Sequence, residues 1–415
     1  MPDQVDPTAA TTKDATALPT EPKAGEVFRA FLKLGVTSFG GPIAHLGYFH
    51  DEFVVRRRWI DEKGYADLVA LCQFLPGPAS SQVGFSLGLR RGGGLLGGLA
   101  AWVAFTLPSA LLLLAFAYGA SAFTGAIGSG VIHGLKVVAV AVVAQAVWGM
   151  AHTLAPDRAR ASIALAAAVL IVGSAGASPG QIAAIVLGAL AGLVFCRGAP
   201  VQATEHFSFP VSRGRGIAAL VIFIALLLLL PIAVHTSGSQ GLALFNAFFR
   251  SGALVFGGGH VVLPLLRAEV VDPGWVSADT FLAGYGAAQA VPGPLFTFGA
   301  YLGAVMKPEP HGLLGAAIGL VAIFLPGMLI LYGTLPFWDA LRARPLAQAA
   351  MRGTNAAVVG ILGAALYDPV WTTAILHPRD FALALTAFVL LTVWKAPPWI
   401  VVAITAAGGV VLGFL

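Results

Sequence analysis

Long apolar runs follow one another along almost the whole chain, and only short polar stretches separate them. Residues 217–234 read IAALVIFIALLLLLPIAV, and similar runs cover residues 161–172 and 381–394. A helix needs roughly 20 mostly apolar residues to cross the hydrocarbon core of a bilayer. The pattern therefore predicts an all-α, polytopic integral membrane protein in which the polar stretches are loops.

The apolar runs belong to two copies of one pattern. FLKLGVTSFGGPIAHL, at residues 31–46, aligns with FFRSGALVFGGGHVVL, at residues 248–263, at an offset of 217. QFLPGP, which begins at Gln73, matches QAVPGP, which begins at Gln289, at an offset of 216. The expected organisation is a disordered tail (1–24), a first repeat (25–197), a linker (198–241) with one membrane helix (217–235), and a second repeat (242–415).

Each copy contains six apolar elements, which in the first copy lie near residues 27–49, 62–89, 94–120, 130–152, 160–175 and 180–196. One further crossing, by the linker helix, turns the second copy upside down relative to the first. Lysine and arginine, which favour cytoplasmic loops, follow elements one, two and four in the first copy but elements three and five in the second. This swap predicts inverted-topology repeats. Because the loops after elements one and two of the first copy are both basic, we expect these elements to be broken or re-entrant.

The PGP motif interrupts element two of each copy. Asp61 is a suitable N-cap, and the helix that follows reaches Pro76 after about 22 Å, which is too short to cross a bilayer. Pro76 and Pro78 cannot continue that helix, and Gly77 permits the backbone angles of a break. The alternative is a simple kink, but a second half-helix would present free amides and a positive dipole end, which predicts an anion site. The candidate ligands are Gln73, Pro76, Gly77, Pro78, Ser80 and Ser81 in the first copy, and Gln289, Pro292, Gly293, Pro294 and Thr297 in the second.

Glycine motifs, SFGGP and VFGGGH, interrupt element one of each copy, and a cation lies two turns before each motif. A cation inside the membrane is costly, so Lys33 and Arg250 are predicted to balance a bound anion; the alternative is that they snorkel to the interface. His45, His260, Lys136 and Asn355 are candidates for proton transfer or for lining a cavity, and the alternative is that they are ordinary satisfied polar side chains. The glycine motifs themselves add the candidates Ser38, Gly40, Gly41, Gly257 and Gly258.

Composition narrows the classes of function. The 415 residues are 58% hydrophobic and only 10% charged, which leaves no room for a soluble domain. The net charge of +5 comes from short basic loops, which indicate topology and not nucleic-acid binding. Cys72 and Cys196 lie in apolar runs, so no disulfide, metal site or cofactor is expected. A membrane-embedded lipid or polyprenyl transferase is the weaker alternative to transport, since the sequence has no Asp-rich metal pair, zinc-ligand spacing or Ser–His–Asp set.

The quoted motifs resemble those of a known family. FLKLGVTSFGGP and QFLPGP in the first copy, with FFRSGALVFGGG and QAVPGP in the second, are similar to the duplicated motifs of the chromate ion transporter family in its two-domain form. The resemblance covers residues 25–415 and departs at Gly259, which replaces the proline of the first motif. It implies a secondary transporter that exports chromate from the cytoplasm by alternating access, in a bacterial inner membrane, and so confers chromate resistance.

Chromate and sulfate are both tetrahedral dianions, so charge and size cannot separate them. A carrier or channel that takes up sulfate or another oxyanion is therefore the main alternative within transport. The expected partners are one such oxyanion, the lipid bilayer and a second copy in a homodimer, with no nucleic acid.

Overall fold

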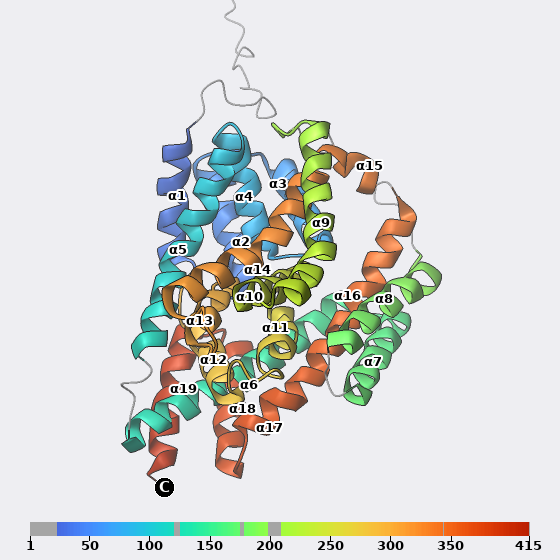
Figure 1. Cartoon of the computed structure of the whole chain (residues 1–415). Helices are drawn as coiled ribbons and strands as arrows, with labels where there is room; N and C mark the ends of the chain where they lie inside the picture. Colours follow the sequence, from blue (N-terminus) through green and yellow to red (C-terminus); the bar gives the residue numbers. More distant parts are fainter. Residues whose placement is uncertain (1–22, 120–124, 175–177, 198–208, 343, 415) are drawn as a thin grey trace, which may run out of the picture.

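The computed structural model describes residues 23–119, 125–174, 178–197, 209–342 and 344–414, and all regular elements in this part of the chain are helices (Figure 1). Six helical stretches are long and apolar enough to cross a membrane, which confirms the predicted all-α, polytopic membrane fold. They contain α5 (Leu95–Gly119), α6 (Gly125–Leu154), α8 (Ser178–Phe195), α9 (Arg213–Ser237), α14 (Gly312–Thr334) and α16 (Pro345–Ala365). The other helices outside elements one and two are α7 (Arg158–Gly173), η5 (Leu335–Phe337), α15 (Trp338–Arg342), η6 (Leu366–Trp371), α17 (Thr372–Ala374), α18 (Pro378–Thr392) and α19 (Pro398–Gly413).

Elements one and two of each copy are pairs of half-helices. The first copy has α1 (Ala24–Thr37), α2 (Gly41–His50) with its extension η1 (Asp51–Arg56), α3 (Glu62–Phe74) and α4 (Ala79–Arg91). The second copy has α10 (Gln240–Ala253), η3 (Gly259–Val261) leading into α11 (Val262–Val270), α12 (Ala278–Ala288), and η4 (Leu295–Thr297) leading into α13 (Phe298–Val305). The longest of these α-helices has 14 residues, or about 21 Å, so none crosses a bilayer alone.

Local sequence explains where the half-helices begin and break. The Asp61 carboxylate accepts the Gly64 amide at 2.8 Å and caps α3, as its predicted role requires. Both PGP loops turn at a glycine in the left-handed region, with φ of 118° at Gly77 and 98° at Gly293. Residues with a side chain rarely adopt such angles, so the breaks depend on glycine at these two positions.

Both half-helix pairs of the first copy begin and end on the same side of the molecule. The Lys23 amide donates to the Arg91 carbonyl at 3.4 Å, so the start of α1 lies beside the end of α4. Glu26, in the first turn of α1, pairs with Arg91 at 2.8 Å and with Arg57, which follows η1, at 3.5 Å. The guanidinium groups of Arg57 and Arg91 both lie over the ring of Trp59. Elements one and two are therefore re-entrant, and the side where these arginines gather is named the basic face.

The second copy repeats this arrangement on the other side, named the opposite face. The Lys307 amide donates to the Trp275 carbonyl at 2.9 Å, which brings the end of α13 to the start of α12. Gly312, the first residue of α14, lies beside Tyr118 at the far end of α5, which starts on the basic face. In Figure 1, α1 and the C-terminus accordingly lie at opposite ends of the molecule. The copies are inverted, and re-entrance explains why two consecutive loops of the first copy are basic.

The two copies interlock through small residues. The last helix of each copy packs against the fourth element of the other, α8 against α16 and α19 against α6. A side chain on Gly353 would overlap with Gly188 of α8, and one on Gly134 would overlap with Thr405 of α19. Glycine at such crossings lets helix backbones approach closely, which is a main source of packing energy inside a membrane. Each copy therefore completes its core with a helix of the other.

Replacing Gly134 with valine should destabilise the protein, because the new side chain meets the Thr405 carbonyl and lies 2.7 Å from the Ala406 Cα. We expect a loss of about 1–3 kcal/mol or more, typical of an overpacked core, measured as a lower melting temperature in detergent. Gly149 lies in the same helix and has no neighbouring atom within 4 Å of an added Cβ, so Gly149→Val is the matched control. Equal melting temperatures for the two variants would contradict the α6–α19 crossing.

Candidate functional site

The breaks of the two copies are hydrogen-bonded to each other. The amide of Gly77, in the first PGP loop, donates to the Val255 carbonyl in the second glycine motif at 2.7 Å. The amide of Gly293, in the second PGP loop, donates to the Ser38 carbonyl in the first glycine motif at 2.8 Å. Ser38 and Val255 are equivalent at the offset of 217, and Gly77 and Gly293 at the offset of 216. The same bond is thus made twice, once in each direction between the copies.

Each PGP loop also packs against a long helix of the other copy. A Cβ on Gly77 would lie 2.9 Å from the Gly327 Cα of α14, and one on Gly293 would lie 2.8 Å from the Ser109 Oγ of α5. Gly327 and Ser109 each follow the proline inside their helix, and they are equivalent positions. Glycine is therefore required in both loops for close approach as well as for its backbone angles.

A small cavity of about 50 Å³, named the crossing pocket, lies where the second PGP loop meets the first glycine motif. Its walls come from the start of α2, the middle of α6, η3, the end of α12 with the PGP loop after it, the start of η4, the end of α18 and the start of α19. The lining residues are Gly40, Gly41, Val142, Gln145, His260, Ala288, Gln289, Val291, Gly293, Leu295, Leu391 and Pro398. None of these is an aspartate or a glutamate.

Two helix N-termini border the crossing pocket. α2 begins at Gly41 and η4 begins at Leu295, and neither has a side-chain hydrogen bond at its N-cap. The first amides of a helix have no partner within the helix and carry the positive end of its dipole. Backbone amides of this kind bind anions without a formal positive charge. The backbone of the pocket is therefore suited to an oxyanion.

Three polar side chains complete the lining, and each is oriented by a protein partner. The Gln145 Nε2 donates to the Leu391 carbonyl at 3.3 Å, and the Gln289 Nε2 donates to the Tyr285 carbonyl at 3.4 Å. The His260 Nδ1 lies 2.6 Å from the Tyr285 hydroxyl. A glutamine amide has a second N–H, and the histidine has a second ring nitrogen, so each group keeps capacity for a ligand. All three would act as uncharged donors.

The predicted polar residues of the first copy gather beside the pocket and not in its lining. Ser38, His45, Ser80 and Ser81 are all almost completely buried, and the His45 Nδ1 lies 3.4 Å from the Ser80 Oγ. Among the described residues, the Ser38 and Ser81 hydroxyls and the His45 Nε2 have no hydrogen-bond partner. This cluster joins the crossing pocket through Ser38, whose carbonyl accepts the Gly293 amide. Gln73, by contrast, is exposed at the end of α3.

The equivalent region of the second copy is less polar. Phe296 stands where the first copy has Ser80, and the Thr297 hydroxyl, which matches Ser81, donates to the Pro294 carbonyl within its own turn at 2.8 Å. Gly257 packs against the last turn of α6, where an added Cβ would lie 2.8 Å from Leu154. The remaining predicted residues form the loops themselves, namely Pro76 and Pro78 in the first copy and Gly258, Pro292 and Pro294 in the second.

Both predicted cations are paired with carboxylates outside the crossing pocket. Lys33 lies 3.3 Å from Glu52, and Arg250 lies 3.9 Å from Glu269. All four positions obey the offset of 217, so this is one ion pair repeated. Burial raises the pKa of the Glu52 carboxyl, but hydrogen bonds from Arg57 and Lys33 outweigh it and hold the pKa below its ordinary value. Lys33 therefore has a carboxylate neighbour without a substrate, although Glu52 also pairs with Arg56 at 2.7 Å and with Arg57 at 2.6 Å.

Lys136 and Asn355, which are equivalent positions on α6 and α16, differ in their partners. Lys136 pairs with Asp279 of α12 at 2.8 Å, and its side chain is only 12% exposed. The Asn355 Oδ1 is buried and has no hydrogen-bond partner among the described residues. Neither side chain lines the crossing pocket.

Sequence reasoning missed Gln145 and the two carboxylates. Gln145 lies within an uninterrupted apolar helix, and position 364 of the second copy, which matches it, is alanine, so neither a break nor the repeat marks it. Glu52 and Glu269 could have been found from the sequence, because they align at the same offset of 217 as Lys33 and Arg250, the cations with which they pair.

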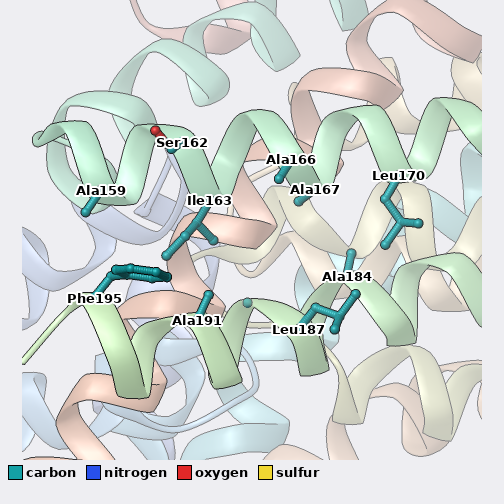
Figure 2. Close-up of a pocket in the computed structure, with 11 residues that line it drawn as sticks. Ala159, Ser162, Ile163, Ala166, Ala167, Leu170, Ala184, Leu187, Ala191 and Phe195 are labelled. Carbon is teal, nitrogen blue, oxygen red and sulfur yellow. The ribbon is translucent and has the colours of Figure 1, made fainter.

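A larger hollow of about 650 Å³ lies between α7 and α8 (Figure 2). Alanines and the larger side chains Ile163, Leu170, Leu187 and Phe195 line it, and Ser162 is its one hydroxyl among the residues drawn. Moving a dianion from water into such an apolar surrounding is strongly unfavourable. This hollow is therefore suited to apolar chains and not to an inorganic ion.

Comparison with known proteins agrees with the repeat. The chain is 29% identical over 410 residues to a chromate transport protein of Pseudomonas aeruginosa, which covers 97% of this chain and 95% of the relative. It is also 29% identical over 392 residues to a probable chromate transport protein of Synechococcus elongatus, covering 92% of this chain and 93% of the relative. The uncharacterized transporter YwrB of Bacillus subtilis is 31% identical over 173 residues, which are 39% of this chain but 83% of that protein. No solved structure matches the chain.

The family model described as chromate transporter matches twice, at residues 25–193 and 242–411. The two matches fall on the two inverted copies and together cover most of the chain. Members of this family are membrane transporters and not enzymes, and the protein belongs to the chromate transporter family.

Proposed function

We propose that the protein exports chromate from the cytoplasm by alternating access, with the crossing pocket as the substrate site, and so confers chromate resistance. One observation carries the proposal: the broken helices of the two copies bond to each other and leave two uncapped helix N-termini beside a pocket without acidic lining. The names of the relatives from Pseudomonas aeruginosa and Synechococcus elongatus supply chromate as the substrate.

The size of the pocket supports a small inorganic ion. Its 50 Å³ corresponds to a few water molecules, since roughly 10–15 Å³ on this measure holds one. The backbone amides at Gly41, together with Gln145, His260 and Gln289, offer uncharged donors to the oxygens of a tetrahedral dianion. The neighbouring cluster around Ser38 adds hydroxyls that have no hydrogen-bond partner in the described part of the chain. A large organic substrate would not fit this space.

The ion pairs support a different role for Lys33 and Arg250 from the predicted one, which was to balance the charge of a bound anion. Because Lys33 and Arg250 lie beside Glu52 and Glu269, we propose that they fix the two halves of element one relative to each other. In each copy the cation lies on the half-helix before the glycine motif and the carboxylate follows that motif. Substrate charge would then be balanced by helix dipoles and not by these side chains.

The membrane orientation supports export. We propose that the basic face is cytoplasmic, as the positive-inside rule requires, and that the membrane is the bacterial inner membrane. Moving a dianion outward across an inside-negative membrane is favourable by about 2.3 kcal/mol per charge for each 100 mV. An exporter therefore needs little additional coupling energy.

Replacing Gln289 with leucine, or Gln145 with leucine, should impair chromate transport. Each change removes an amide donor from the crossing pocket, and a buried hydrogen bond to a charged group contributes about 1.5–3 kcal/mol. We expect uptake of labelled chromate into everted membrane vesicles to fall by about tenfold or more, with a higher KM. Gln240→Leu, at the start of α10 and outside the pocket, is the matched control.

Adding excess sulfate to the same vesicles separates the two substrate classes. Weak competition by sulfate would support chromate as the substrate. Strong sulfate transport without chromate flux would overturn the proposed substrate while leaving an oxyanion site in place. Normal chromate flux in both glutamine variants would overturn the crossing pocket as the site.

Replacing Gly293 with alanine should abolish transport by separating the two copies at their crossing. The φ of 98° disfavours any side chain, and the new Cβ would lie 2.8 Å from the Ser109 Oγ and 3.2 Å from the Phe105 carbonyl. Gly363, in α16, has no atom within 4 Å of an added Cβ, so Gly363→Ala should transport normally at equal expression. Full chromate flux in Gly293→Ala would refute a close PGP contact.

A further inference from the structure

The two copies match in sequence but differ in burial. Leu265 of α11 is 3% exposed, whereas Tyr48, its equivalent in α2, is 41% exposed. Leu282 of α12 is completely buried, whereas Ala66, its equivalent in α3, is exposed. The half-helices of the second copy are therefore covered on a side where those of the first copy are open.

The difference arises from the helices against which the re-entrant pairs pack. α12 lies along α6, and a Cβ on Gly286 would overlap with the Leu135 carbonyl. α11 packs against α16 and α8. Among the described residues, α3 has no comparable packing on α16, and α2 has none on α6 or α19. In the second copy, elements one and two thus pack against α6, α8 and α16. In the described part of the first copy, elements one and two lack the equivalent packing.

The re-entrant elements of the first copy are therefore left uncovered on the side of the basic face. Exposed residues of α2 and α3 lie there, and Gly40, which also lines the crossing pocket, is exposed. On the opposite face, the packed α11 and α12 separate the pocket from solvent. Since inverted repeats can exchange conformations, the alternate state should close the first copy and open the second.

One ion pair holds the closed side. Lys136 of α6 and Asp279 of α12 are 2.8 Å apart, and this contact joins the second re-entrant pair to the helix on which it closes. The equivalent positions in the other half are Asn355 of α16 and Lys63 of α3. No hydrogen bond joins these two in the described structure, Lys63 is exposed, and the Asn355 Oδ1 is buried without a partner.

We propose that the Lys136–Asp279 ion pair is the lock of a gate on the opposite face, and that a Lys63–Asn355 hydrogen bond replaces it when the gate on the basic face closes. The proposal deepens the proposed function, because it rests on alternating access. An ion pair is stronger than a hydrogen bond between lysine and a neutral amide, so the lock favours the state in which the second copy is closed; because the Asp279 side chain is 66% exposed, this bias is modest. In the exchanged state Ala70 lies against Thr354, as Gly286 now lies against Leu135.

Cysteine cross-linking of the full-length protein in membranes tests this exchange. Ala70→Cys and Thr354→Cys together should form a disulfide slowly, because these residues meet only in the exchanged state. Adding Asp279→Asn removes the lock and should accelerate the cross-link by about twofold to fivefold, as expected for a partly exposed ion pair. The native Cys72 and Cys196 are buried and do not interfere.

Two matched variants isolate the lock. Asp272→Asn neutralises another carboxylate on the opposite face, one that pairs with Arg267 of the same copy at 3.7 Å, and should leave the cross-linking rate unchanged. Exchanging the charges, with Lys136→Asp and Asp279→Lys, should restore the slow rate. An unchanged rate in Asp279→Asn, or no cross-link in any variant, would overturn the gate. Cross-linking needs no chromate, so its expected acceleration without chromate flux would support the gate and reject only the proposed substrate.

Discussion

A backbone amide at membrane depth must find a partner, and this requirement shapes the whole molecule. Each PGP loop interrupts a helix and frees amides and carbonyls that would cost several kcal/mol each if left unpaired in hydrocarbon. The bonds from Gly77 to Val255 and from Gly293 to Ser38 satisfy those groups across the boundary between the copies. In each case the partner comes from the other copy, so the breaks of the two copies support each other.

The same bonds determine what the centre of the molecule can hold. They use one amide of each PGP loop and leave the uncapped start of α2 beside the crossing pocket. Lys33 and Arg250 lie beside carboxylates outside the pocket, and the pocket lining itself contributes dipoles and amides. A site of uncharged donors can release a dianion as readily as it binds one, which transport requires. The re-entrant helices of the second copy are also more covered than those of the first, so the surroundings of this site differ between the two faces.

The sequence predicted the architecture well because the repeat signal is physical. A constant offset located both sets of breaks, and the distribution of arginines indicated that elements one and two return to the face from which they start. The difference in burial between Tyr48 and Leu265 could not be predicted in this way, because the alignment of equivalent residues does not say which copy is covered by other helices. The contact between Ser80 and His45 could not be predicted either, because the packing of the half-helices and not the local sequence pattern determines where these side chains point. Gln145 lines the pocket because α6, which is not one of the re-entrant elements, forms part of its wall. The motifs of the re-entrant elements could not indicate this residue.

The central claim is that a chromate ion binds where the broken helices of the two copies meet. Anomalous diffraction at the chromium edge, from crystals grown with chromate, tests this claim most directly because it locates the metal atom independently of any activity. The account predicts one strong chromium peak between Gly41 and Gly293, within hydrogen-bonding reach of Gln289. A chromium peak in the hollow between α7 and α8, or at the ion pairs of Lys33 and Arg250 with the crossing pocket empty, would contradict it.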